Sequence, residues 1–189
     1  MITHKGTRTL ETDRLILRKA TREDAIPMFR NWASDPEVTK FLTWPTHDKV
    51  EVSRYVLESW ISEYGKDDFY QWMIVEKGLG EPVGSISVVR QNEEIAEAEI
   101  GYCIGRAWWH RGIMTEALTA VMEYLITDVG MNRIAARHDP NNPHSGGVMR
   151  KCGMEYEGTS RASDRNNRGI CDASHYGISR SDWEKRRPG

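Results

Sequence analysis

The chain has 189 residues, of which 29% are charged and 39% are hydrophobic, and its formal net charge is −2. This near-balance of charge excludes a strong electrostatic attraction to nucleic acid or to an acidic membrane surface. The three cysteines form no CxxC pair, so neither a metal site nor a redox motif is expected. We find no signal-peptide core and no apolar run near the roughly 20 residues of a membrane span, which predicts a cytoplasmic protein. The length suits one domain over 1–189.

The N-terminal third predicts one short strand followed by two helices. Leu15 and Leu17 alternate with polar neighbours, as in a half-buried strand. Thr21 stands three residues before Asp24, a spacing typical of a capping box at a helix start. A second helix is expected over Asp48–Tyr64, where apolar residues recur at helical spacing.

The rest of the chain predicts mostly strands, joined by two further helices. We expect strands over 70–76, 83–91, 95–104, 133–138, 154–161 and 170–179, helices over 112–128 and 142–152, and a polar loop over 162–169. Strands that alternate with helices near the middle favour at least one parallel pairing. The order of elements indicates an α+β fold in three layers, with a mixed sheet between helices.

The segment Trp109–Leu118, WHRGIMTEAL, leads from a predicted strand into a predicted helix. The first turn of a helix leaves backbone N–H groups unpaired, and the helix dipole adds partial positive charge there. Gly112 allows close approach of a ligand and Arg111 is adjacent, so this turn could hold a pyrophosphate. An ordinary strand-to-helix turn is the alternative, because single glycines are common in such turns.

Four segments occur in a characteristic order: LETDRLILRKATREDA, GSISV, AEIGYCIGRAWWHRGIMTEAL and NNPHSGGVMRKCGMEYEGT. Together they resemble the GNAT superfamily of N-acetyltransferases, most closely its ribosomal-protein N-terminal acetyltransferase branch, over about Leu10 to Trp183. The resemblance implies a mixed, largely antiparallel sheet of six to seven strands with helices on both faces. It also implies acetyl-CoA as cosubstrate, no metal, and an amine acceptor that is a protein N-terminus or a small molecule. A homodimer is compatible with it.

The same resemblance implies how acetyl-CoA is held. Backbone N–H groups from His110 to Thr115 would bind the pyrophosphate, and the backbone of Tyr102–Ile104 would pair with the pantetheine amides as an added strand does. Two residues depart from the superfamily motif: Trp109 replaces Gln or Arg, and Met114 replaces a small residue. The expected cofactor-binding residues are Tyr102, Cys103, Ile104, Trp109, His110, Arg111, Gly112, Ile113, Met114, Thr115 and Asn142.

The expected catalytic residues are Glu99, Asn142 and Ser145. In the family pattern the amide of Asn142 bonds the pantetheine arm, although an asparagine here could also be a simple helix cap. Many superfamily members carry a tyrosine seven residues later as the acid, and this chain has Met149 there. Ser145 resembles the serine that stabilises the leaving thiolate in the ribosomal-protein branch.

The identity of the base is left open by the sequence. Glu99 resembles the glutamate that precedes the Gly-Tyr pair of this branch, while Glu97, His138 and a water are alternatives. Some N-terminal acetyltransferases place their base five residues before the asparagine, which is Arg137 here. An α-amine, with a pKa near ~8, is easier to deprotonate than a lysine near ~10.4.

Direct attack in a ternary complex is the expected mechanism, with the acceptor entering beside the Phe41–Thr46 loop. Two other functions stay open: a small-amine acetyltransferase, acting for example on an antibiotic or a polyamine, and a non-catalytic acyl-CoA sensor or interaction module.

Overall fold

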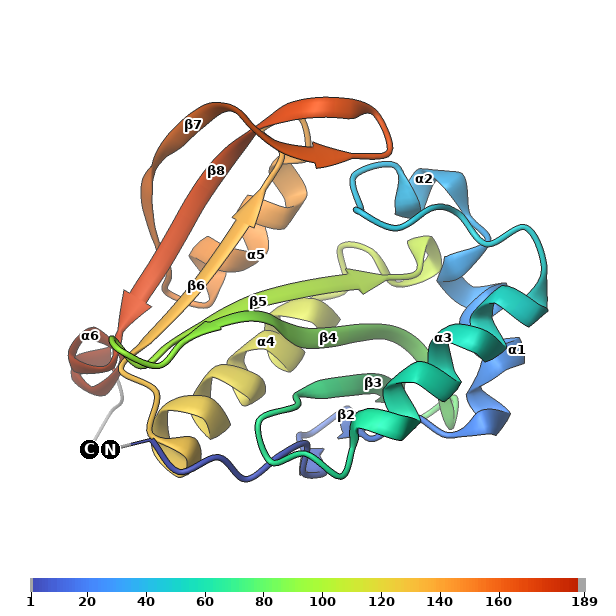
Figure 1. Ribbon diagram of the computed structural model, residues 1–189, viewed down its shortest axis with the longest axis horizontal. Helices are drawn as coiled ribbons and strands as arrows, with labels where there is room; N and C mark the ends of the chain where they lie inside the picture. The colour runs from blue at the N-terminus through green and yellow to red at the C-terminus, as the bar shows by residue number, and fades with distance from the viewer. Residues whose placement is uncertain (1, 187–189) are drawn as a thin grey trace.

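The computed structural model describes residues 2–186, which form one eight-stranded sheet flanked by helices (Figure 1). The spatial order of the strands is β1-β2-β3-β4-β5-β6-β8-β7. Neighbouring strands are antiparallel except β5 and β6, which are parallel. The bounds are β1 Leu10–Glu11, β2 Leu15–Arg18, β3 Gln71–Glu76, β4 Glu81–Asn92, β5 Glu97–Ile104, β6 Arg133–His138, β7 Glu155–Asn166 and β8 Gly169–Ser179. The predicted mixed, largely antiparallel α+β sheet is confirmed.

The expected count of six to seven strands is too low, because β1 adds an eighth. This strand has only two residues, pairing Leu10 with Leu17 and Glu11 with Ile16, so it is too short to show any alternation of apolar and polar residues. The predicted polar loop over 162–169 is also wrong, since β7 continues to Asn166. Most residues of β7 are exposed, so this strand lacks the apolar face on which a sequence pattern depends.

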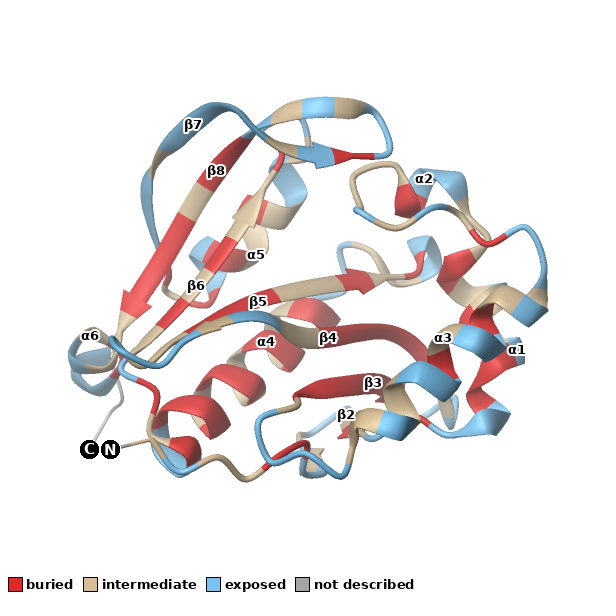
Figure 2. Ribbon diagram, viewed as in Figure 1, coloured by how far each residue is buried: buried red, intermediate tan, exposed pale blue. Residues whose placement is uncertain are grey.

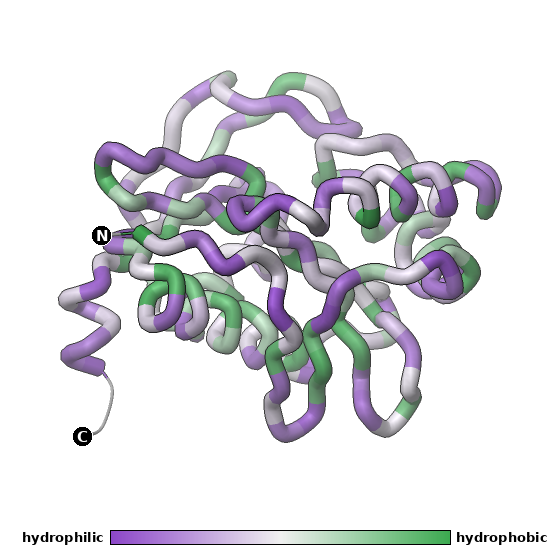
Figure 3. Tube along the Cα trace, turned by 60° about the horizontal axis from the view of Figure 1, so that its bottom comes forward, coloured by the Kyte–Doolittle hydropathy of each residue, from purple (hydrophilic) through white to green (hydrophobic). Residues whose placement is uncertain are grey.

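Helices cover both faces of the sheet, as predicted (Figure 1). They are α1 Ala25–Met28, α2 Pro36–Thr39, α3 Val50–Glu63, α4 Ile113–Glu123, α5 Pro143–Lys151 and α6 Arg180–Arg186, with wider helical turns at Phe29–Ala33 and Tyr124–Val129. The predicted cap before α1 is confirmed, because the Asp24 carboxylate accepts a hydrogen bond from the Thr21 N–H at 2.8 Å. Helix α6 was not predicted: it is largely hydrophilic in Figure 3, and Trp183 is its one buried residue.

Two apolar cores form, one on each face of the sheet, because successive side chains of a strand point to opposite faces. On β3, Trp72 and Ile74 pack into the core that contains α4, whereas Met73 packs with α1 and α3 on the opposite face. Buried residues accordingly fill the inner side of α4 and the central strands in Figure 2, and exposed residues cover β7 and the outer side of α3.

The parallel strands β5 and β6 pair over only three residues and then separate. Their register runs from Glu97 opposite Arg133 to Glu99 opposite Ala135, after which β6 stays paired with β8 and β5 stays paired with β4. Figure 1 shows the two strands diverging beyond that point. Within the described residues, the edge of β5 over 100–104 therefore has no strand partner on the β6 side.

One glycine of α5 is required by packing and its neighbour is not. A Cβ added at Gly146 would lie 2.5 Å from Nε2 of His138, a distance that no real Cβ contact reaches. At Gly147, a Cβ would meet nothing within 4 Å. Contact with His138 therefore explains the glycine at position 146 and does not explain the one at position 147.

We expect Gly146→Ala and Gly147→Ala to change stability in opposite directions. The first creates an overlap with the His138 ring and should lower the free energy of unfolding by about 1–3 kcal/mol. The second should raise it by about 0.5–1 kcal/mol, because alanine favours a helix. Urea unfolding of both variants measures the difference, and equal effects would contradict the packing role of Gly146.

The His138 side chain is held in a desolvated position on β6. Its Nδ1 lies 2.8 Å from the Asp139 carbonyl oxygen, and its buried Nε2 has no hydrogen-bond partner among the described residues. Burial lowers the pKa of His138 below its usual value. The unfolded chain therefore takes up the proton first on acidification, near pH ~6.5.

Stability should consequently fall as the pH drops from about 6.5 toward the lowered folded-state pKa of His138. His138→Gln removes this titration, so we expect its free energy of unfolding to fall less steeply between pH 7 and pH 5 than that of the wild type. His47, whose pKa burial also lowers, contributes equally to both proteins. If the free energy of unfolding changed with pH by the same amount in the two proteins, the pKa of His138 would be the same in the folded and the unfolded chain, and the prediction would be wrong.

Candidate active site

A cavity of about 370 Å³ lies where β5 and β6 separate. Three parts of the chain line it: the end of β5 with the turn that follows and the start of α4, the helix α5 along its length, and the end of α2 with the loop after it. The lining residues are Val38, Phe41, Leu42, Tyr102, Cys103, Ile104, Trp108, Trp109, His110, Gly112, Ile113, Met114, Thr115, Asn142, Pro143, His144, Ser145, Gly147, Val148, Arg150 and Lys151. The structure thus brings together every expected cofactor-binding residue except Arg111, and the expected catalytic residues Asn142 and Ser145.

The turn before α4 has an unusual backbone. His110 (φ 59°) and Gly112 (φ 74°) both adopt left-handed conformations, one on each side of Arg111. Gly112 is the N-cap residue of α4, and no side chain caps the first turn. A Cβ at Gly112 would meet only Nη2 of Arg14, at 3.5 Å. The first N–H groups of α4 are thus uncapped behind a residue with no side chain, which suits close approach of an anion.

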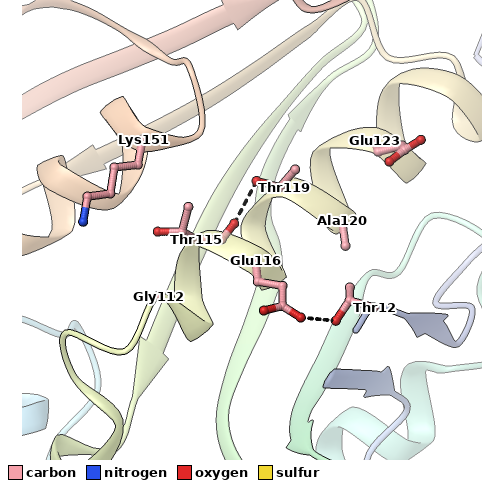
Figure 4. A pocket seen from close by; sticks show the side chains of 8 residues that line it. All are labelled: Thr12, Gly112, Thr115, Glu116, Thr119, Ala120, Glu123 and Lys151. Carbon is pink, nitrogen blue, oxygen red and sulfur yellow. Dashed lines mark hydrogen bonds between the residues drawn. The ribbon is translucent and has the colours of Figure 1, made fainter. Parts of the chain in front are cut away.

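Charged side chains from the first strands hold this turn in place. Arg14 donates from Nη1 to the Arg111 carbonyl oxygen at 2.9 Å and from Nε to Glu116 at 2.6 Å. Thr12 also donates to Glu116, at 2.6 Å, and Figure 4 shows this contact on the side of α4 away from Lys151. The Arg111 side chain pairs with Glu76 at 3.3 Å instead of lining the cavity.

Two hydroxyl groups meet on the wall of the cavity. The Tyr102 hydroxyl donates to the Ser145 carbonyl oxygen at 2.9 Å, and the Ser145 hydroxyl donates to the Tyr102 oxygen at 3.2 Å. Burial raises the pKa of Tyr102, so its hydroxyl stays protonated at neutral pH. The family resemblance implied only a backbone role for Tyr102. Tyr102 stands between Ile100 and Ile104 on the same face of β5, and neither isoleucine has a polar group. A lone hydroxyl on this apolar face is the signal that could have identified Tyr102 as a side chain of the site.

Asn142 contributes a side chain that is free to bind a ligand. Its backbone N–H donates to the Asp139 carbonyl oxygen at 2.7 Å. Its side-chain amide makes no hydrogen bond within residues 2–186 and does not cap α5. Met149, seven residues further along, is buried in the core and carries no proton to donate.

Glu99 does not line the cavity. Its carboxylate is buried between two guanidinium groups, with Oε1 2.7 Å from Arg137 and Oε2 2.7 Å from Arg90. Arg137 stands five residues before Asn142, so the two positions considered for the base are joined as an ion pair. Glu97 is similarly bound by Arg133 at 2.6 Å. A role for Glu99 as base stays a prediction.

The loop after α2 is held by the turn between β7 and β8. Asn167 donates from Nδ2 to the carbonyl oxygens of Thr39 at 2.8 Å and Trp44 at 2.7 Å, and from its backbone N–H to that of Leu42 at 3.1 Å. Figure 1 shows this turn reaching the loop after α2. The contact fixes Phe41 and Leu42 against the cavity, in the loop where the acceptor was expected.

No group of three or more His, Cys, Asp and Glu side chains in residues 2–186 is arranged to hold a metal ion. None of the helices described is both long enough and apolar enough to cross a membrane.

Comparisons with known proteins agree with this geometry. The family model "Acetyltransferase (GNAT) domain" matches residues 14–155. An uncharacterized N-acetyltransferase, p20 of Bacillus licheniformis, is 32% identical over 153 residues, which is 81% of this chain and 85% of the relative. The ribosomal protein uS5-alanine N-acetyltransferase of Escherichia coli is 30% identical over 162 residues, or 80% of each chain.

A solved structure shows the same fold. The microcin C7 self-immunity acetyltransferase MccE, in complex with acetyl-CoA and AMP, superposes with a TM-score of 0.79 at 20% identity, covering 89% of this chain and 93% of that one. The family match spans most of the sheet and the whole turn before α4. The chain therefore belongs to the GNAT family and is an acetyl-CoA-dependent N-acetyltransferase.

Proposed function

We propose that the acceptor is an α-amine, that of a protein N-terminus, attacked directly in a ternary complex. The observation that carries the choice is the absence of any Asp or Glu among the residues that line the described cavity. Its only permanently charged lining residues, Arg150 and Lys151, are cationic. A lysine side chain or a polyamine, with pKa values near ~10.4, would enter as a cation with no carboxylate to receive it, whereas an α-amine near ~8 loses its proton more easily.

The lining residues fit acetyl-CoA, which would supply the acetyl group as a thioester. The unpaired edge of β5 at Tyr102–Ile104 offers backbone groups to the pantetheine amides, as a neighbouring strand would. The free amide of Asn142 faces the same cavity, and the uncapped first turn of α4 offers N–H donors to the pyrophosphate. The acetyl-CoA complex of MccE supports this assignment by its shared fold.

Ser145 and Tyr102 are proposed to stabilise the leaving thiolate by hydrogen bonding. Their hydroxyls are in contact, and both are protonated at neutral pH. When the Ser145 hydroxyl donates a hydrogen bond to the departing thiolate, its oxygen can accept one from the Tyr102 hydroxyl, so the pair can stabilise the thiolate where Met149 cannot. The thiolate then takes its proton from solvent water. The sensor hypothesis rests on Met149, Met114 and the uncertain base, and this pair answers the first of the three.

The amine proton is proposed to leave through water toward Glu99. Glu97 and His138 are less suited to act as the base. Glu97 is paired with Arg133, and Nε2 of His138 faces Gly146. Because both oxygens of Glu99 are engaged by Arg90 and Arg137, any proton transfer must loosen one of these ion pairs.

A small amine is the second candidate acceptor. The MccE complex contains AMP beside acetyl-CoA, which shows that one protein of this fold binds a small molecule together with acetyl-CoA.

The acceptor can be identified by measuring CoA release at pH 7.5 with three acceptors. These are a peptide with a free α-amine, the same peptide with its α-amine blocked and one free lysine, and a polyamine. We expect turnover with the free α-amine only. Turnover with the polyamine or the lysine and none with the α-amine would contradict the proposal, and binding of acetyl-CoA without turnover on any amine would favour a sensor.

Variants of the cavity serve as controls for this assay. Asn142→Ala and Ser145→Ala should each lower turnover by roughly one to two orders of magnitude, as expected when the positioning of the thioester and the hydrogen bond to the leaving thiolate are lost. Glu99→Gln should change the pH dependence of the rate. Wild-type rates and pH profiles in all three variants would remove these residues from the mechanism.

A further inference from the structure

Two histidines meet across the exposed rim of the cavity. His110 belongs to the turn before α4, and His144 lies in the first turn of α5. Their rings are in edge-to-face contact, with centroids 4.7 Å apart and an angle of 80° between the planes. Both residues line the cavity, and both are exposed. The pair therefore connects the two sides of the opening between β5 and β6.

The backbone of His110 directs its ring toward this contact. Its φ of 59° lies in the left-handed region, which few residues other than glycine adopt and in which histidine is enriched with Asn and Asp. Arg111, the next residue, points the other way and pairs with Glu76. The turn thus places the imidazole of His110 at the cavity and the guanidinium of Arg111 away from it.

The ring nitrogens of both histidines are available to a ligand. Within residues 2–186, neither His110 nor His144 makes a side-chain hydrogen bond or an ion pair, and their contact with each other is through the rings. Each imidazole carries at least one N–H donor in any tautomer. Since Arg150 and Lys151 line the same cavity and no carboxylate does, the ligand that suits these donors is an anion.

We propose that His110 and His144 together bind the diphosphate of acetyl-CoA, one imidazole from each side of the cavity. This inference rests on the proposed function, which places the pyrophosphate at the turn containing His110. It adds His144, a residue of the opposite wall, as a ligand-binding side chain. Donors from two separate elements would hold the diphosphate while the pantetheine arm lies along β5.

His144→Phe tests the proposal because phenylalanine keeps a ring at this position and removes both nitrogens. Calorimetry measures its affinity for acetyl-CoA, and competition against acetyl-CoA measures its affinity for S-acetylpantetheine, which has the same thioester arm without the diphosphate. We expect His144→Phe to weaken acetyl-CoA about tenfold, the scale of one hydrogen bond to a charged group, and to leave S-acetylpantetheine unchanged. Unchanged acetyl-CoA affinity, or equal loss for both ligands, would overturn the proposal.

A second variant approaches the pair from the other side. His110→Asn tolerates the left-handed backbone, so the turn should keep its shape. If both imidazoles act on one diphosphate, the loss in the double variant should be smaller than the product of the single losses, whereas independent, multiplicative losses would contradict joint binding. His175→Phe, on β8 outside the cavity, is the matched control and should bind as the wild type does.

The wild-type titration separates this inference from the proposed function. If the wild type fails to bind acetyl-CoA, the proposed function and the histidine pair fall together. If the wild type binds acetyl-CoA and both histidine variants bind equally well, the cavity assignment stands and the histidine pair alone is wrong.

Discussion

The separation of β5 from β6 is the constraint on which the site depends. Parallel strands are normally paired along their length, and an unpaired strand edge inside a fold leaves backbone groups without partners. Here pairing stops after three residues because β6 follows β8 while β5 follows β4. The opening receives side chains from α5 and backbone from the turn before α4, so one departure from regular pairing brings the expected binding residues to a single cavity.

The surrounding contacts keep that opening in shape. Arg14 and Glu116 fix the turn before α4 from the side of the first strands. Asn167 fixes the loop after α2 from the side of the last hairpin. On the wall between them, Tyr102 of β5 is tied to Ser145 of α5. The cavity is therefore supported from both ends of the sheet, which is the arrangement expected where reacting groups must be positioned.

Local patterns in the sequence predicted the strands and helices that have a buried face. The range expected for β6 is identical to the observed Arg133–His138, and α3 differs from its prediction by two residues at the start and one at the end. The misses are elements without such a face: β1 is too short, β7 is exposed along most of its length, and α6 is hydrophilic. The sequence pattern of apolar residues carries no information about these elements, because tertiary contacts alone hold them.

The sequence predicts the backbone part of the candidate site more fully than the side-chain contacts that join distant segments. The turn at Gly112 has a short motif, so its role could be inferred from a few neighbouring residues. The Tyr102–Ser145 contact joins residues 43 positions apart, and the ion pair of Glu99 with Arg137 joins residues 38 apart. Such pairs depend on how β5, β6 and α5 are oriented in space, which no local pattern encodes.

The central claim is that the separated strands and the turn before α4 form a site for acetyl-CoA. Calorimetric titration of the purified protein with acetyl-CoA, with ATP as the control, tests it most directly, because ATP carries phosphates and adenine without a pantetheine arm to lie along β5. We expect micromolar binding of acetyl-CoA and none of ATP. Folded protein that binds neither ligand, or that binds ATP as tightly as acetyl-CoA, would contradict it.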